Sequence, residues 1–390
     1  MNMHDYADRL KGLPFYLYPT IEATTDEAIQ KGLKIIDLST GDPKFATPDY
    51  IIQALQKACE DPATHHYGSV AGYPPFRKAI AQWYQKRFGV ALDPAREIIT
   101  FVGSKEGIAF LPLAFINPGD VVLIPDPGYP TYRYAASFAG ARLEAFPLRP
   151  ENNYEPDFDE IPETVAKEAK IIYLNYPNNP TGATVDKGFF KRAVQFAKKY
   201  GIMIAHDAAY SEVTFDGYRT PSLFEIEEAR EVGIEFHTLS KTFCMTGWRV
   251  GFAVGHPRII EGLLEVKRVS SSGHFPAIER AGVEALSRFP VELEANNRAL
   301  AERRDLVIRE FRRFGIDVKP PRGSYYVWFK IPKGRNSLSF VKKLILETGV
   351  ITFPGIGYGN NGEGFMRIAF VEDLSTIEEA LRRLEPYLRT

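Results

Sequence analysis

Short apolar segments alternate with amphipathic segments through the middle of the chain, and this alternation constrains the fold more than any other feature. The amphipathic segments have helical spacing, as in Ser104–Phe115. The apolar segments are apolar on both faces, as strands covered on both sides must be. They lie at 98–102, 121–124, 171–175, 203–206, 235–239 and 250–254. The pattern predicts an α/β fold in which helices cover a mostly parallel sheet.

The C-terminal third has a different pattern, typical of a smaller α+β domain. Its expected elements are a charged helix at 290–314, strands at 325–329, 350–353 and 365–370, and helices at 338–347 and 374–388. At 390 residues, two domains are the default expectation. We predict a large domain over 46–280 and a discontinuous small domain over 1–45 and 281–390. The first helix of the large domain should have Thr47 as its N-cap and Pro48 in its first position.

Charge and cysteine content exclude several classes of function. The net charge is −1, from 48 basic and 49 acidic residues, so the basic excess of a nucleic-acid or membrane surface is missing. No apolar segment reaches the roughly 20 residues that span a bilayer, and residues 1–10 do not resemble a signal peptide. Cys59 and Cys244 are not spaced as a metal pair, and the histidines form no metal motif. We expect a cytoplasmic protein without metal, nucleic-acid or membrane partners, in which His206 and His237 are packed strand-end residues.

A lysine in a Ser/Thr-rich turn follows one predicted strand. Ser240 and Lys241 come directly after this strand, and Arg249 lies eight positions beyond the lysine. A lysine that forms a Schiff base needs neighbours that favour its neutral form. The Ser240 hydroxyl and the Arg249 guanidinium would suit a phosphate beside it. Taken alone, an ordinary loop lysine explains this segment equally well.

Polar residues also follow two other predicted strands. Asp207 ends one apolar strand, at the sheet edge where open α/β sheets bind ligands. A carboxylate there could keep a pyridine nitrogen protonated, and Tyr210 could donate to a hydroxyl of the same ring. Asn179 lies in the turn Asn175–Gly182 and could contact the ring oxygen. The structural alternatives are a capping aspartate and a rigid turn rich in Pro, Asn and Gly.

Three further signals are weaker when taken singly. The segment Gly103–Gly107 opens a helix after a strand, so the amides of Ser104 and Lys105 could bind an anion. Tyr129 could stack on an aromatic ring, or it could lie on the surface of a proline-rich turn. Arg367 interrupts an apolar strand, and its planar guanidinium suits a carboxylate unless it faces outward from an edge strand.

Together and in this order, these residues resemble the class I/II aminotransferases of pyridoxal 5′-phosphate (PLP) fold type I. The resemblance covers nearly the whole chain and is carried by Asn179–Gly182, Asp207 with Tyr210, Ser240 and Lys241 with Arg249, and Arg367. It implies a large domain with a mostly parallel, seven-stranded sheet and a smaller α+β domain. It also implies an enzyme that uses PLP to move an amino group between an L-amino acid and a 2-oxo acid.

The resemblance implies roles for individual residues. The implied catalytic residues are Lys241, which holds PLP as a Schiff base and transfers protons, Asp207, which pairs with the pyridinium nitrogen, and Tyr210. The implied cofactor-binding residues are Ser104, Lys105, Tyr129, Asn179, Asp207, Tyr210, Ser240, Lys241 and Arg249. Tyr67 is implied to reach the phosphate in a neighbouring subunit, which means a homodimer with shared sites. The implied substrate contacts are Tyr16, Gly41, Asn179 and Arg367, the last of these to the α-carboxylate.

The preferred substrate is less narrowly specified. Gly103–Gly107 and Tyr16–Pro19 resemble the LL-diaminopimelate aminotransferase subfamily, in which 2-oxoglutarate is the acceptor. Val269 stands where this subfamily leads us to expect an asparagine that contacts cofactor and substrate. Aspartate, alanine and aromatic amino acids stay open as substrates. A PLP-dependent β C–S lyase is the alternative activity, because it would keep both Lys241 and Asp207.

Overall fold

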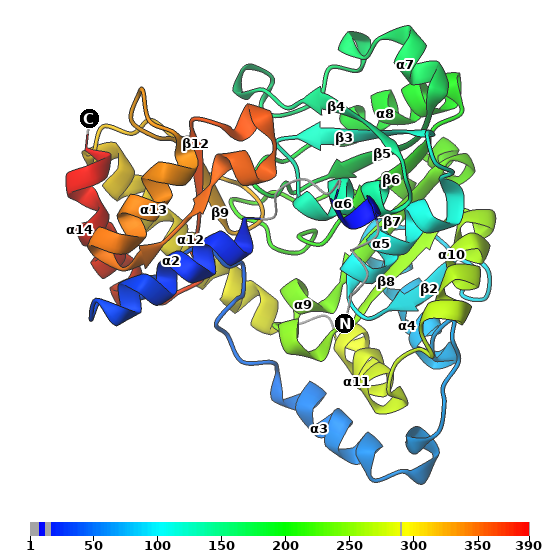
Figure 1. Cartoon of the computed structure of the whole chain (residues 1–390). Coiled ribbons are helices and arrows are strands. Elements are labelled where there is room, and N and C mark those ends of the chain that lie inside the picture. The colour runs from blue at the N-terminus through cyan, green and yellow to red at the C-terminus, as the bar shows by residue number, and fades with distance from the viewer. Residues whose placement is uncertain (1–7, 12–16, 289–290, 390) are drawn as a thin grey trace, which may run out of the picture.

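A seven-stranded sheet forms the centre of the larger part of the molecule (Figure 1). The computed structural model describes residues 8–11, 17–288 and 291–389. The strand order is β2-β8-β7-β6-β5-β3-β4, in which β8 is antiparallel to both neighbours and the other pairs are parallel. The strands are β2 (Ile98–Phe101), β3 (Val121–Asp126), β4 (Arg142–Pro147), β5 (Ala169–Asn175), β6 (Met203–Asp207), β7 (Gly233–Thr238) and β8 (Gly251–Gly255). The mostly parallel sheet predicted from the sequence is confirmed.

The edge strand β4 was not among the strands predicted from the sequence. Only Phe146 of its six residues is buried, and Arg142 and Ala145 are exposed. An edge strand pairs on one side only, so it does not need the continuous apolar segment that marks the central strands.

The start of the first long helix also differs from the prediction. This helix, α3, spans Asp49–Cys59, and Pro48 is its N-cap. Thr47 does not cap the helix, because its hydroxyl donates instead to the carbonyl oxygen of Cys244 at 2.8 Å. The predicted capping role of Thr47 is therefore wrong, and its side chain ties the start of the helix to the segment after Lys241.

Helices cover both faces of the sheet and form two separate apolar cores. The first core includes residues of α3, α4 (Pro74–Phe88), α7 (Glu163–Glu168), α8 (Lys187–Tyr200), α9 (Leu239–Thr242) and α11 (Pro276–Ser287). The second includes residues of α5 (Ser104–Phe115), α6 (Pro130–Phe138) and α10 (Pro257–Ser270). Successive strand residues alternate between them, so Ile204 lies in the first core and Ala205 in the second. No helix in the described ranges is long and apolar enough to cross a membrane.

A third core joins the two ends of the chain (Figure 1). Its helices are α2 (Tyr18–Gln30), α12 (Val291–Arg313), α13 (Ser337–Thr348) and α14 (Leu374–Leu388). Its antiparallel sheet has the order β11-β12-β9, from Phe353–Pro354, Phe365–Ala369 and Tyr326–Lys330, and β1 (Ile36–Asp37) pairs in parallel with β10 (Val350–Ile351). The helices predicted for the C-terminal third and the strands predicted at 325–329 and 365–370 are present. The single strand predicted at 350–353 is instead two short strands, β10 and β11, which belong to different sheets. The domain boundaries at 45/46 and 280/281 stay predictions.

Candidate active site

A cavity of about 250 Å³ lies at the carboxyl ends of β5, β6 and β7. This edge of an open α/β sheet is where ligands bind in such folds. The cavity brings together most of the residues singled out from the sequence. They are Gly41, Ser104, Lys105, Tyr129, Asn179, Asp207, Tyr210, Ser240, Lys241, Arg249 and Arg367. Residues as far apart in the chain as Gly41 and Arg367 therefore line one cavity.

Two of the positions singled out from the sequence do not line this cavity, and a third lies outside the described residues. Tyr67 is 92% exposed, so a role in cofactor binding would require the cavity of a second copy. Tyr16 lies outside the described residues, whereas Tyr18, two positions later, lines the cavity. Val269 is 88% exposed near the end of α10 and is not a lining residue.

Lys241 is the only lysine besides Lys105 in the lining, as far as the structure describes the chain. Its Nζ donates to the carbonyl oxygen of Gly41 at 2.7 Å. Burial lowers the pKa of Lys241 to about 8; Asp42 opposes this shift, while Arg249 and Arg367 add to it. A neutral amine is therefore accessible close to neutral pH, which a nucleophile or a proton acceptor requires.

Asp207 is a buried carboxylate at the end of β6, with 5% of its surface exposed. Its Oδ2 accepts a hydrogen bond from the Tyr132 hydroxyl at 2.7 Å, and its Oδ1 accepts one from the Ala209 amide at 3.2 Å. Burial raises the pKa of Asp207, and these hydrogen bonds work against the rise. A buried carboxylate at a cavity favours a cationic partner, such as a protonated ring nitrogen. Tyr132 was not predicted from the sequence, although it follows Tyr129 by only three residues.

A second group of lining residues supplies donors for an anion. Helix α5 begins at Ser104 without a side-chain cap from the described chain, and the amides at a helix start favour an anion. The hydroxyl of Ser240 is buried and has no hydrogen-bond partner among the described residues. At Gly103, with φ +79°, an added Cβ would lie 2.4 Å from Arg249 Nη2. Glycine therefore lets the guanidinium of Arg249 approach the start of the helix.

Arg367 is buried, with 3% of its surface exposed, on the central strand β12. Its Nη1 donates to Asn179 Oδ1 at 2.7 Å, and its Nη2 donates to the Ser39 carbonyl oxygen. Its Nε has no partner in the part of the chain that the structure describes. A buried guanidinium without a carboxylate partner is suited to a carboxylate ligand. The alternative of an arginine that faces outward from an edge strand is wrong.

Tyr326 connects several lining residues and was missed by the sequence analysis. Its ring centroid lies 3.9 Å from the Arg367 guanidinium carbon, and its hydroxyl lies 3.0 Å from that of Tyr210. An added Cβ at Gly41 would lie 1.9 Å from the Tyr326 hydroxyl, so the close approach requires glycine there. The other lining residues that were not predicted are Tyr18, Thr40, Asn175, Ala209 and Thr238. Within a predicted apolar strand, Tyr326 gives the sequence pattern of an ordinary core residue.

Comparison with known proteins identifies the family. The sequence pattern of the family "Aminotransferase class I and II" matches residues 34–384, and the chain belongs to this family. The LL-diaminopimelate aminotransferase of Syntrophobacter fumaroxidans is 46% identical over 378 residues, which cover 97% of each chain. The enzyme of the same name from Aquifex aeolicus is 46% identical over 383 residues, covering 98% of this chain and 99% of that one.

A solved structure agrees with this membership. Substrate-bound BacF from Bacillus subtilis matches the fold with a TM-score of 0.95 at 35% identity, covering 98% of both chains. The protein is an aminotransferase with PLP fold type I, as the resemblance in its sequence implies.

Proposed function

We propose that this aminotransferase uses PLP to transfer an amino group from LL-diaminopimelate to 2-oxoglutarate. The observation that carries the proposal is that Lys241, Asp207 and Arg367 line one cavity. These side chains offer an amine, a buried carboxylate and a buried guanidinium to one small molecule. The choice of donor is supported by the two relatives at 46% identity, which are LL-diaminopimelate aminotransferases.

The lining residues match the chemical groups of PLP. The buried carboxyl of Asp207 suits the ring nitrogen, and the unpartnered hydroxyl of Ser240 suits a phosphate oxygen. The remaining residues assigned to the cofactor are Tyr210 and Asn179 for the ring oxygen, Tyr129 for the ring face, and Ser104, Lys105 and Arg249 for the phosphate. When bound, PLP supplies an aldehyde that condenses with amines and a ring that accepts the electron pair released at the substrate Cα.

Three side chains then transfer protons, keep the ring nitrogen protonated and bind the substrate. Lys241 takes the proton from the substrate Cα and later delivers one to the aldehyde carbon, for which its lowered pKa is suited. Asp207 holds the proton on the ring nitrogen. Arg367 binds the α-carboxylate, and Asn179 fixes one edge of its guanidinium.

We further propose a homodimer with shared active sites in the cytoplasm. Tyr67, at 92% exposure, is a large side chain that a second copy would cover. Its expected contact with a neighbouring cofactor requires that it project from its own subunit. The described chain has two free cysteines, Cys59 and Cys244, which supports a reducing environment.

The test is a spectral titration of the PLP-loaded protein with single amino acids. LL-diaminopimelate should convert the absorption band of bound PLP to that of the amino form fastest, and 2-oxoglutarate should restore it. Faster conversion by aspartate, alanine or an aromatic amino acid would assign that donor instead. Pyruvate formed from a cysteine conjugate without any 2-oxo acid would establish a β C–S lyase. The Lys241→Ala variant serves as the control for binding without turnover.

A further inference from the structure

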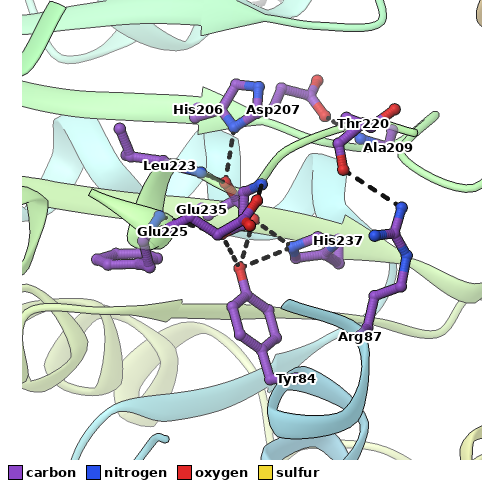
Figure 2. A network of polar contacts seen from close by, with 12 residues as sticks. Tyr84, Arg87, His206, Asp207, Ala209, Thr220, Leu223, Glu225, Glu235 and His237 are labelled. Atoms are coloured by element: carbon purple, nitrogen blue, oxygen red, sulfur yellow. Dashed lines mark hydrogen bonds and ion pairs between the residues drawn. The ribbon is translucent and has the colours of Figure 1, made fainter. Parts of the chain in front are cut away.

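A buried polar cluster lies behind Asp207, on the opposite face of the sheet (Figure 2). Its members are Tyr84 of α4, His206 of β6, and Glu235 and His237 of β7, none more than 3% exposed. Successive strand residues point to opposite faces, so Asp207 lines the cavity while His206 faces the first core. The aminotransferase chemistry described above uses none of the four. Charged groups at such depth need a specific arrangement of partners.

Glu235 has the contacts of an ionised carboxylate. Its Oε1 accepts from the Tyr84 hydroxyl and contacts His237 Nε2 at 2.8 Å. Its Oε2 accepts from the Leu223 amide at 2.7 Å and contacts His206 Nδ1 at 2.8 Å. Four contacts match the four lone-pair sites of an ionised carboxylate. Burial raises the pKa of Glu235, but the hydrogen bonds from His206 and His237 outweigh it and lower the pKa far below its ordinary value.

His206 has an acceptor at each ring nitrogen. Its Nδ1 faces the Glu235 carboxylate, and its Nε2 lies 3.2 Å from the backbone carbonyl oxygen of Tyr176. A carbonyl and an ionised carboxylate can only accept, so both nitrogens must carry a hydrogen. An imidazole with two N–H groups is a cation.

His237 differs in this respect, although it shares the same carboxylate. Its contacts with Glu235 and with the Tyr84 hydroxyl, at 2.8 and 3.2 Å, both involve Nε2. One proton on that nitrogen satisfies both contacts, so a neutral ring suffices. The phenyl ring of Phe252 stacks on His237 with a centroid distance of 5.1 Å. His237 is thus a matched comparison for His206 within one cluster.

We propose that His206 is a fixed imidazolium, held by Glu235 and the Tyr176 carbonyl, whose charge keeps the neighbouring Asp207 ionised at the cavity. His206 is a positioning residue in this scheme, since it acts on the cofactor only through Asp207. Burial drives Asp207 toward its protonated form, and the hydrogen bonds from Tyr132 and the Ala209 amide counteract this. A positive charge on His206, or on His237 if that ring were also protonated, adds to them. The effect of His206 on Asp207 rests on the proposed function, because it matters only where Asp207 faces the PLP ring nitrogen.

The charge of His206 can be measured without any cofactor. In protein labelled with ¹⁵N-histidine, two side-chain N–H signals that disappear in His206→Gln should persist from about pH 6 to pH 9. Of the titratable groups around this ring, Glu235 of β7 contacts it directly and Asp207 is its neighbour in β6. His237 of β7 and Tyr84 of α4 contact the other oxygen of Glu235, and the charge of Glu225 acts on Tyr84. A single protonated nitrogen on His206 within this range would overturn the proposal, whether or not PLP binds.

The effect on Asp207 is tested by PLP affinity, from titration of the apoprotein followed by fluorescence. His206→Gln and Glu235→Gln should each weaken PLP binding about tenfold, the difference between a charge-assisted and a neutral hydrogen bond. His237→Gln, an equal change in volume on the same carboxylate, should weaken it less than about twofold. Equal losses in the two histidine variants, or an unchanged affinity in His206→Gln, would refute the electrostatic role. Wild-type protein that binds no PLP would refute the proposed function and leave the NMR result standing.

Discussion

The cavity has two walls that are built in different ways. The sheet wall consists of Asp207, the last residue of β6, and of Ser240 and Lys241, which lie just after the end of β7. The aromatic wall consists of Tyr326 and Arg367 on β9 and β12, together with Tyr18 at the start of α2. Main-chain register fixes the first wall, as in the pairing of Asn175 with Asp207. Side-chain packing fixes the second, as in the stacking of Arg367 on Tyr326.

The difference indicates a division of labour. The sheet wall presents a carboxylate and an amine with shifted pKa values, which are the groups that move or hold protons. The aromatic wall presents a cation that cannot lose its proton, in a frame of rings, which is suited to hold a carboxylate. Changes in the sheet wall should therefore reduce kcat, and changes in the aromatic wall should mainly raise KM. The following predictions test this separation, from the largest expected effect to the smallest.

Lys241→Ala should abolish transamination, with a loss of more than about 10⁴-fold in kcat, because the proton carrier and covalent anchor disappear together. PLP should still bind, since the contacts of Asp207 and the phosphate donors remain. Reduction with borohydride should attach PLP permanently to the wild-type chain but not to the variant, and mass spectrometry detects the difference in mass. Full turnover in the variant would remove Lys241 from the mechanism.

Arg367→Ala should raise KM for amino and 2-oxo acids about a hundredfold, the effect of losing hydrogen bonds to a charged group. Arg367→Lys keeps the charge but loses the planar fork, so about a tenfold rise is expected. Steady-state kinetics of both variants separate KM from kcat. If kcat falls while KM for every substrate is unchanged, the division between the two walls is wrong.

The rate of covalent attachment of PLP to the apoprotein should depend on the protonation of Lys241. The pKa of this amine is lowered from the ordinary 10.5 to about 8 because the group is buried. The reactive neutral form therefore increases as pH rises toward 8 and is nearly complete above it. The rate should rise roughly tenfold per pH unit below 8 and level off above it. A rise that continues to pH 10 would show that Lys241 titrates as an exposed lysine.

Tyr326→Phe should have the smallest effect, about a two- to threefold rise in KM. This variant loses the hydroxyl contact with Tyr210 but keeps the ring beneath Arg367. Tyr326→Leu removes the ring and should raise KM about tenfold, because the guanidinium of Arg367 loses the ring on which it stacks. The comparison of the two variants separates the contribution of the ring to KM from that of the hydroxyl. Equal effects would mean that the hydroxyl, and not the stacking, positions the aromatic wall.

The sequence by itself determined the sheet wall and most of the fold. Buried parallel strands need apolar residues on both faces, so β5, β6 and β7 stand out, and the polar residues at their ends mark the ligand edge. Asp207, Ser240 and Lys241 could be found this way because their signals are local. β4 could not, since only one of its six residues is buried and it carries the charged residues Arg142 and Glu144.

Only the tertiary structure decided which side chains from distant segments meet. In the sequence, Tyr326 and Tyr132 both have the pattern of core aromatic residues. The structure shows that the ring of Tyr326 stacks on Arg367 and that the hydroxyl of Tyr132 donates to Asp207. The predicted packing of His206 and His237 is confirmed, but the charge inferred for His206 depends on acceptors from two other segments. Such pairings follow from strand register and from contacts between cores, which no local pattern of residues specifies.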